Sequence, residues 1–425
     1  MELWDEWMKW VRPLEEACSR RTSAFWMMTV LAGFCIRDDL LGATSFVRAL
    51  RLRPACYKSL INLFHSDALD IDRLTRCWTR TVLRLHPGVL RFGGMLVMVV
   101  DIIKVAKEGR KMPSVKKHHQ ESASNSKPEY IMGHLCQSVG VLAGMFGKFA
   151  FIPFASRIHE GLKLGNFDKR TPLDKLVQLL DSLALPEPFL VVADAYYGAG
   201  KLVLALLERG AHLITRCRSN GVAYEQPEPK KRTGRGRPKL YGRKVHLRTL
   251  FDEAMTEAPS PVYGDTSVMI GYCFRDLIWR PSRSLVRFVA VDHPKRGRAI
   301  FMHTDTGTDP LDIVRLYGYR FKIEVAFKHA LHVVGVWTYR FWMAAMEPLK
   351  KGGGTQHLHR KSKEYRERAA RKMRAYHRFI QLGLIAQGVM VALATTVPDL
   401  VGRHFRKVDP FVKTKNHWIF NSCGK

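Results

Sequence analysis

Two short apolar runs that each stop at an aspartate constrain this chain more than any other feature. Met95 to Val100 is a continuous run rich in β-branched residues, and Asp101 follows it directly. Phe189 to Ala193 is a second such run, and Asp194 follows it. Uninterrupted apolar runs of this length are typical of strands that are buried on both faces of a sheet. Because a helical pattern follows from Lys201 to Arg209, we expect an α/β core with an acidic side chain at the end of two strands.

The rest of the chain divides into helical and strand-like parts. Residues 1–92 carry aromatic and apolar residues at helical spacing, which predicts a separate all-helical region. Leu311 to Val334 has the pattern of one amphipathic helix and carries Glu324. Further helices are expected at Pro172–Leu185 and Lys361–Phe379, and further strands at Ile131–Phe151 (two strands with a tight turn), Ala211–Thr215, Ser267–Phe274, Leu285–Asp292 and Ala299–His303.

The charge balance predicts a polyanionic partner. The 69 Lys and Arg residues outnumber the 38 Asp and Glu residues, for a formal net charge of +31. Such a balance favours nucleic acid or an acidic membrane surface. The most apolar segment, Phe379 to Val397, is interrupted by Gln381 and Gln387, and the chain does not open with a signal-peptide pattern. The eight cysteines form no CxxC pair. We therefore expect a soluble, cytoplasmic protein with reduced thiols and no zinc site.

Three acidic residues are candidates for metal-dependent chemistry. Asp101, Asp194 and Glu324 together would supply the hard oxygen ligands that Mg²⁺ or Mn²⁺ prefers, and two such ions can promote phosphodiester displacement. Each acid also has a structural interpretation. The two aspartates are suited to capping turns or helices. Glu324 lies four residues from both Arg320 and Lys328, the spacing of a surface ion-pair ladder.

The segment from Tyr317 to Glu324 carries a family resemblance. It resembles the Tyr-x2-Arg-x3-Glu-x6-Lys signature of DDE transposases from bacterial insertion sequences, the insertion-sequence-four kind, and Asp194-Ala195-Tyr196-Tyr197 falls in the family's order. The resemblance implies a ribonuclease H-like catalytic core interrupted by a β-rich insertion. It also implies a metal-binding triad of Asp101, Asp194 and Glu324 that holds two Mg²⁺ ions, with Mn²⁺ as a substitute. The implied activity is cleavage at transposon ends followed by strand transfer into target DNA.

The sequence departs from that signature at two positions. The closing lysine falls on Leu331, although Lys328, one turn earlier, can take over a phosphate contact. Tyr196 replaces the glycine usual between the second aspartate and its aromatic residue. These departures leave a second hypothesis open, that the chain is a catalytically impaired copy repurposed as a sequence-specific DNA-binding protein. A structure-selective nuclease on the same core is a third.

The basic segments and the signature together give the predicted DNA contacts. Arg235-Gly236-Arg237-Pro238 resembles an AT-hook that reads the narrow minor groove, although a solvated linker or a nuclear-import signal has the same composition. Lysines and arginines after Asp101, beginning with Lys104, are placed as a phosphate-binding loop would be. The predicted DNA-binding residues are Tyr317, Arg320, Lys328, Lys104, Arg235, Arg237 and Lys239.

These interpretations combine into one domain plan. Residues 1–92 form a helical domain for DNA-end binding or dimerisation, and residues 93–216 form the first part of the core. Residues 217–306 hold the basic linker and β-rich insertion, residues 307–345 hold the final core helix with Glu324, and residues 346–425 form a basic helical region. The expected partners are transposon ends, target DNA and further copies of the chain, as a homodimer or larger synaptic complex. No membrane is expected as a partner, and the protein would be associated with a bacterial nucleoid.

Overall fold

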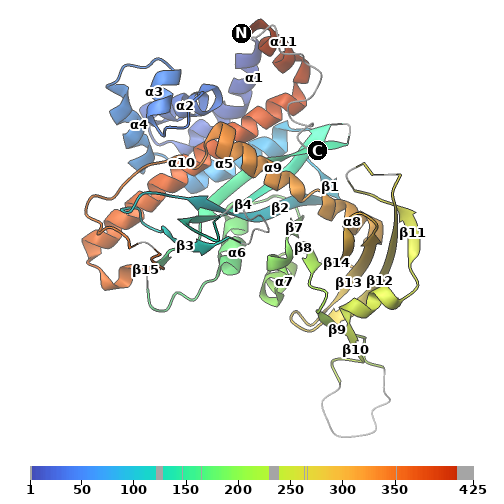
Figure 1. Cartoon of the computed structure of the whole chain (residues 1–425). Coiled ribbons are helices and arrows are strands. Elements are labelled where there is room, and N and C mark those ends of the chain that lie inside the picture. Colours follow the sequence, from blue (N-terminus) through green and yellow to red (C-terminus); the bar gives the residue numbers. More distant parts are fainter. Residues whose placement is uncertain are drawn as a thin grey trace. The chain divides into compact units, whose positions relative to one another are not determined.

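The computed structural model describes residues 2–120, 128–145, 147–163, 165–228, 239–262, 264–265, 267–350 and 352–408. Within these, the chain forms two compact units, and strand β2 (Met95–Ala106) passes from one into the other (Figure 1). Unit 1 comprises residues 1–90, 101–186 and 322–425. Unit 2 comprises residues 91–100 and 187–321.

Unit 1 begins with the predicted helical region. Its helices are α1 (Glu2–Val11), η1 (Arg12–Ala17), α2 (Arg21–Ile36), α3 (Thr44–Ala49), α4 (Cys56–His65) and α5 (Ile71–Leu85). Helix α5 begins where the sequence supplies an N-cap, because the Asp70 carboxylate accepts hydrogen bonds from the backbone N–H groups of Asp72 and Arg73, both at 2.9 Å. One face of α5 is buried, including Leu74, Trp78 and Val82.

A long antiparallel hairpin forms the sheet of unit 1. Strands β4 (Tyr130–Met145) and β5 (Lys148–Ile158) pair along their length, with a register shift between Val139 and Gly140. The two strands predicted within Ile131–Phe151 are present, and the second continues seven residues beyond the predicted end, to Ile158. Strand β3 (Lys116–His119) pairs with β4, and β4 lies beside β2 in the sheet. The short strands β6 (Leu162–Lys163) and β15 (Gln356–His357) pair with each other. Two further short elements of unit 1 are the helix α6 (Pro172–Ser182) and the 3₁₀ turn η5 (Leu358–Arg360).

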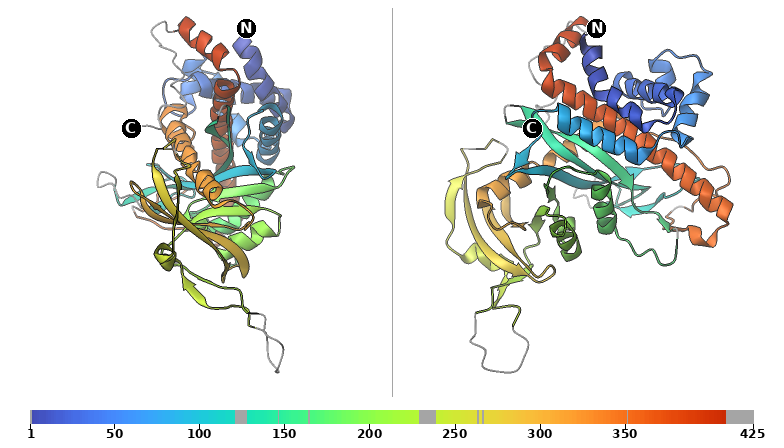
Figure 2. Two further views of the ribbon diagram at one scale, coloured as in Figure 1. Left: turned by 90° about the vertical axis from the view of Figure 1, so that its right-hand side faces the viewer. Right: turned by 180° about the vertical axis from the view of Figure 1, so that it is seen from behind.

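The core of unit 1 is organised around helix α10 (Lys363–Thr396), which packs on β5 (Figure 2). The predicted basic helix is the first half of α10, and the second half is apolar and buried. By length and composition alone α10 is able to span a membrane, but most of its apolar segment is buried against other parts of the protein, as in the core helix of a globular domain. The two glutamines that interrupt this segment make internal hydrogen bonds: the Nε2 of Gln381 donates to the Phe154 carbonyl at 2.7 Å, and that of Gln387 to the Ala326 carbonyl at 2.8 Å. The chain ends its described part in α11 (Pro398–Val408).

Unit 2 is built on a mixed sheet. The first part of β2 pairs in parallel with β7 (Phe189–Ala193), and β7 pairs in parallel with β8 (His212–Cys217). From β8 onward the sheet is antiparallel, through β14 (Gly297–His303), β13 (Ser284–His293) and β12 (Met269–Trp279). The smaller elements are β1 (Arg91–Phe92), η2 (Ala195–Tyr197), α7 (Gly200–Leu207), β9 (Val222–Tyr224), β10 (Lys244–His246), η3 (Leu247–Asp252), β11 (Thr256–Pro259) and α8 (Pro310–Gly318). Each strand predicted in this part of the chain is present.

The strand predicted to end at Val100 and the helix predicted from Leu311 to Val334 differ from their predicted extents. Strand β2 does not end at Asp101 but continues to Ala106, because its second part lies beside β4 and keeps a hydrogen-bonding neighbour. The helix predicted from Leu311 to Val334 is interrupted after Gly318, where α8 ends, and α9 (Phe321–His329) begins three residues later. The interruption lies at the boundary between the two units, so the apolar residues of α8 are buried in unit 2 and those of α9 in unit 1.

Candidate active site and nucleic-acid interface

Asp101 and Asp194 each directly follow a member of the last register pair of two parallel strands. Val100 of β2 is paired with Ala193 of β7, and the two aspartates are the next residues along each strand. Asp194 also has the predicted capping role, because its Oδ1 accepts the Tyr196 N–H at 3.0 Å at the start of η2. The Oδ1 of Asp101 accepts the N–H of Ile102 at 2.7 Å. Both carboxylates are therefore oriented by short-range backbone hydrogen bonds.

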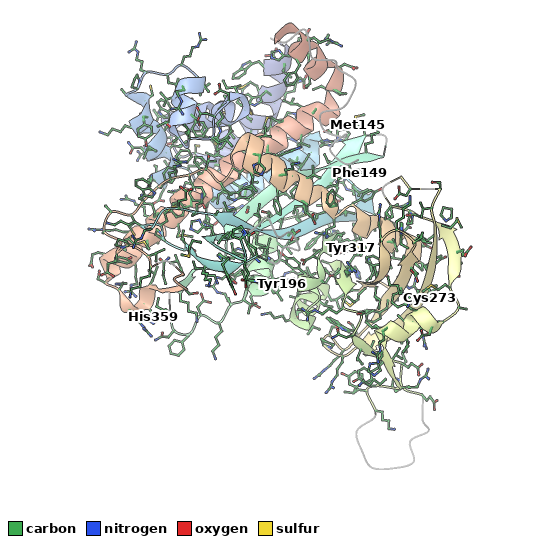
Figure 3. The ribbon with its side chains drawn as sticks, in the orientation of Figure 1. Met145, Phe149, Tyr196, Cys273, Tyr317 and His359 are labelled. Carbon is green, nitrogen blue, oxygen red and sulfur yellow. The ribbon has the colours of Figure 1, made fainter. Side chains whose placement is uncertain are left out.

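Two cations and one carboxylate in unit 2 shift the pKa of the Tyr317 hydroxyl. Tyr317 lies at the end of α8 and packs on Phe301 of β14, with ring centroids 4.7 Å apart (Figure 3). Burial raises the pKa of Tyr317, while Arg320 and Arg216 lower it in part and Asp194 raises it further. The guanidinium carbon of Arg320 is 5.8 Å from the Tyr317 ring centroid. Tyr317, Arg320 and Asp194 are thus close enough to interact electrostatically, and the raised pKa keeps the phenol protonated at neutral pH.

Arg216 is a member of this cluster that the sequence analysis missed. It lies on β8, is exposed, and is the register partner of Phe301. The Thr215 hydroxyl beside it donates a 2.6 Å hydrogen bond to the Asp194 carbonyl. No motif marks Arg216 in the sequence, and only the pairing of β8 with β14 shows that it lies near Tyr317.

Glu324 lies on α9 in unit 1. Its helix is anchored by a buried stripe of Ile323, Ala326, Ala330 and Val334, whereas the side chains of Glu324 and Lys328 are both exposed. The last turn, η4 (Ala330–Val334), is a π-helix with an extra residue in its hydrogen-bonded loop. Leu331, the position of the signature lysine, falls within this turn.

The residues of the predicted triad have the right chemistry for a hard divalent cation. All three are carboxylates, whose oxygens are the ligands that such a cation prefers. Among the residues that the structure describes, however, no group of three or more His, Cys, Asp or Glu side chains lies close enough to hold a metal ion. Asp101 and Glu324 belong to unit 1 and Asp194 to unit 2.

The lysine-rich segment after Asp101 makes extensive internal contacts. Lys104 donates to the His119 carbonyl at 2.7 Å, and Lys107 donates to the Trp337 carbonyl and lies 3.7 Å from the Tyr339 ring centroid. The remaining cations behave alike: Arg110 donates to the Leu349 carbonyl, Lys111 to the Ala344 carbonyl, and Lys116 pairs with Glu160. The contacts of Lys107, Arg110 and Lys111 fasten the segment to residues 337–349. Lys239 is exposed, and Arg235 and Arg237 lie outside the described residues.

The first turns of α10 carry a different set of cations. Lys363, Arg366, Arg368 and Arg371 are exposed and are called here the α10 cationic segment. Further along the helix, two arginines form ion pairs within unit 1. Arg374 and the buried Arg378 both pair with Asp67, at 3.4 and 2.8 Å. The predicted basic helix therefore has an exposed cationic half and a structural half.

His134 is a core residue of unit 1. It is fully buried in unit 1, where Nδ1 is 2.7 Å from the Tyr339 hydroxyl and Nε2 is 2.9 Å from the Pro113 carbonyl. Burial lowers the pKa of His134 to about 3, which keeps the ring neutral.

Comparison with known proteins gives a match to a family and matches to solved structures, one of which is described here. Residues 163–261 match the model of the DDE superfamily endonucleases. No curated protein matches the chain. A cryo-EM structure of the piggyBac transposase synaptic complex with hairpin DNA is similar at a TM-score of 0.37 and 10% identity, covering 100% of this chain and 83% of that one. At this score the likeness identifies no residue of one chain with a residue of the other. The matched segment contains Asp194 and strands β7 to β11, so part of this chain resembles a DDE superfamily endonuclease.

Proposed function

We propose that this protein is a DDE transposase that cleaves DNA at transposon ends and transfers the freed strand into target DNA. The observation that carries the proposal is the match of residues 163–261 to the DDE endonuclease family, because that segment contains Asp194. The register of β2 and β7, in which Asp101 and Asp194 directly follow the last paired residues, supports it. The finer assignment, to the insertion-sequence-four kind, rests on the Tyr317-to-Glu324 signature alone.

In this proposal Asp101, Asp194 and Glu324 hold two Mg²⁺ ions, or Mn²⁺ in their place. Such ions would supply Lewis-acid chemistry, with activation of the attacking oxygen and charge stabilisation of the leaving oxygen of the phosphodiester. Tyr317, Arg320 and Arg216 bind phosphates of the DNA end beside Asp194. The raised pKa of Tyr317 suits this task, because a protonated phenol donates a hydrogen bond to a phosphate oxygen. The two guanidiniums supply the charge.

The proposed fold is a ribonuclease H-like core made of β2, β4, β5, β7 and β8. Its mixed sheet combines the parallel strands β2, β7 and β8 with the antiparallel hairpin of β4 and β5. Strands β9 to β14 fall between residues 222 and 303 and correspond to the proposed β-rich insertion. DNA is the proposed partner, bound by a homodimer or larger synaptic complex in the bacterial cytoplasm, and Lys104, Lys328, Lys239, Arg235 and Arg237 are proposed as further contacts.

A cleavage and joining assay tests the proposal. The substrate is DNA carrying the ends that flank the gene, incubated with Mg²⁺ and, in parallel, with EDTA. We expect metal-dependent nicking followed by a joined product. Glu324→Gln should abolish both steps, while Glu15→Gln, which changes an exposed acid on η1, should leave them unchanged.

The other outcomes identify the competing functions. Tight, salt-sensitive binding without cleavage in Mg²⁺ or Mn²⁺ would establish the repurposed DNA-binding protein. Cleavage without a joined product would establish a nuclease. Wild-type rates for Glu324→Gln would show that the triad is assigned wrongly.

A further inference from the structure

A buried arginine binds the end of the helix that carries Glu324. Arg37 follows α2 in the N-terminal helical region and is only 7% exposed. Its Nε donates to the Val334 carbonyl at 3.1 Å, and its Nη2 donates to the carbonyls of Val334 and Gly335, the latter at 2.9 Å. These carbonyls lie at the end of η4, which continues directly from α9. The segment that Arg37 binds is therefore 297 residues away in sequence but adjacent in unit 1.

The guanidinium is held on its other sides by the N-terminal region. Nη1 donates to the Ser45 hydroxyl at 3.0 Å and lies 3.4 Å from the Gly42 carbonyl. The guanidinium carbon lies 4.6 Å from the ring centroid of Phe34 and 4.9 Å from that of Phe46. A cation enclosed in this way has one orientation, and that orientation directs it at the end of η4.

The partners of Arg37 are unusual for a buried charge. The nearby carboxylate Asp39 forms a bidentate ion pair with Arg48. Its interaction with Arg37 is a Coulomb attraction, which only partly offsets the lowering of the Arg37 pKa by burial. Arg37 is instead hydrogen-bonded to neutral acceptors, mainly backbone carbonyls at the negative end of a helix, where a cation is favourable. A buried cation is costly to maintain, so its presence at this helix end calls for a role that an apolar residue would not fill.

Gly335 shows that the fit between Arg37 and the helix end is close. Its φ of +71° is favourable for glycine at a helix C-terminus. A Cβ at this position would lie 2.3 Å from Nη2 of Arg37. Any side chain at position 335 therefore displaces the guanidinium, which provides a second way to disturb the contact.

We propose that Arg37 is a positioning residue for Glu324, fixing the rotation and tilt of α9 and η4 from the end opposite the carboxylate. Gln387 fixes the middle of α9 through the Ala326 carbonyl, and Arg37 fixes its end. The inference rests on the proposed function of Glu324 as a metal ligand. It assigns the N-terminal helical region a part in the active site, because that region supplies Arg37.

The test compares Arg37→Lys, Gly335→Ala and the control Arg48→Lys in the full-length protein. Arg37→Lys keeps the charge but removes the fork that binds two carbonyls. Arg48 belongs to the same region but pairs with Asp39 on the surface. Three quantities are measured: the Mn²⁺ dissociation constant by electron paramagnetic resonance, the Mg²⁺ concentration for half-maximal end cleavage, and the DNA dissociation constant in EDTA.

We expect Arg37→Lys and Gly335→Ala to raise both metal-related values about tenfold and to leave DNA affinity within about twofold, as for a displaced ligand. Arg48→Lys should match the wild type. In a Glu324→Gln background, Arg37→Lys should cause no further loss of Mn²⁺ affinity, because it acts through that carboxylate. Gly335→Ala, which disturbs the contact from the helix side, provides the answer if Arg37→Lys does not fold.

Two results would overturn the inference, and they are distinguishable. Wild-type Mn²⁺ affinity and Mg²⁺ dependence in folded Arg37→Lys and Gly335→Ala would show that the contact is structural only. Additive losses in the Glu324→Gln background would have the same meaning. A wild-type protein whose Mn²⁺ affinity does not change with Glu324→Gln would overturn the proposed function itself, and the inference with it.

Discussion

Neutralising the α10 cationic segment should reduce the salt dependence of DNA binding by an amount that the structure bounds. Lys363, Arg366, Arg368 and Arg371 are the exposed cations of this segment. Each cation that neutralises one phosphate contributes about 0.9 to the slope of log K against log salt concentration. Replacing all four by glutamine therefore lowers the slope by at most about 3.6. Between 50 and 200 mM salt, the DNA affinity of the wild type should therefore fall by a factor up to roughly 150 times larger than that of the variant.

The assay is a fluorescence anisotropy titration of end-bearing duplex DNA at several salt concentrations, in EDTA so that no cleavage occurs. Glutamine is a good helix former, so α10 should remain folded, which far-UV circular dichroism checks. Two single variants provide the matched comparison. Arg371→Gln should lower the slope by about 0.9, whereas Arg374→Gln should lower it by less, because Asp67 already pairs with Arg374.

An unchanged slope in the folded quadruple variant would refute this reasoning. It would mean that the exposed cations of α10 do not contact phosphates and that the charge responsible for binding lies elsewhere. Equal effects of Arg371→Gln and Arg374→Gln would refute the narrower argument that the Asp67 pair withdraws Arg374 from DNA.

Three further predictions concern the stability of unit 1. Gly388→Ala should destabilise the protein by about 1–2 kcal/mol in urea unfolding, because the new Cβ would lie 2.4 Å from the buried Trp78 ring and this clash outweighs the helix propensity of alanine. Asp70→Ala should cost about 1 kcal/mol in the same measurement, because it removes the N-cap of α5. The lowered pKa of His134 makes the unfolded state bind protons more readily below pH 6.5, so its contribution to stability is present above that pH and falls by about 2 kcal/mol at pH 5. Unfolding of the wild type and of His134→Gln at pH 5 and pH 7 measures this contribution as the part of the pH dependence that the variant lacks, and the exposed His119→Gln should keep the wild-type dependence. An unaltered stability between the two pH values, or a stabilised Gly388→Ala, would contradict the corresponding argument.

Apolar patterning predicted most of the secondary structure because local burial determines it. The run Phe189–Ala193 forms β7 with the predicted bounds, since a strand buried on both faces needs apolar residues at every position. The same reasoning failed where the environment of a strand changes along its length. β2 is fully apolar only up to Val100, and its continuation, in which Asp101 and Lys104 interrupt the apolar run, is stabilised by β4, a partner that no local pattern reveals.

The candidate site was predicted only in part because its remaining members are related by tertiary contacts. Tyr317, Arg320 and Asp194 are marked by a motif and a strand end, whereas Arg216 is brought to them by strand pairing alone. The lysines after Asp101 show that composition does not separate a structural role from a role in DNA binding. Their composition predicts a phosphate-binding loop, but a lysine that donates to a carbonyl 230 residues away, as Lys107 does, has the same sequence signature as one that binds DNA.

The π-turn at the end of α9 changes how spacing along this helix should be counted. A turn closed by an i→i+5 hydrogen bond holds one residue more than an α-turn, so it acts as a one-residue insertion that leaves the helix axis intact. A seven-residue interval counted from Glu324 on an ideal α-helix ends at Leu331, which is partly buried, while the exposed residue is the next one, His332. Deleting one residue within Ala330–Val334 would restore an α-turn and withdraw the Val334 carbonyl from Arg37. The shift of the exposed position from Leu331 to His332 and the contact of the helix end with Arg37 therefore both depend on the one extra residue of the π-turn.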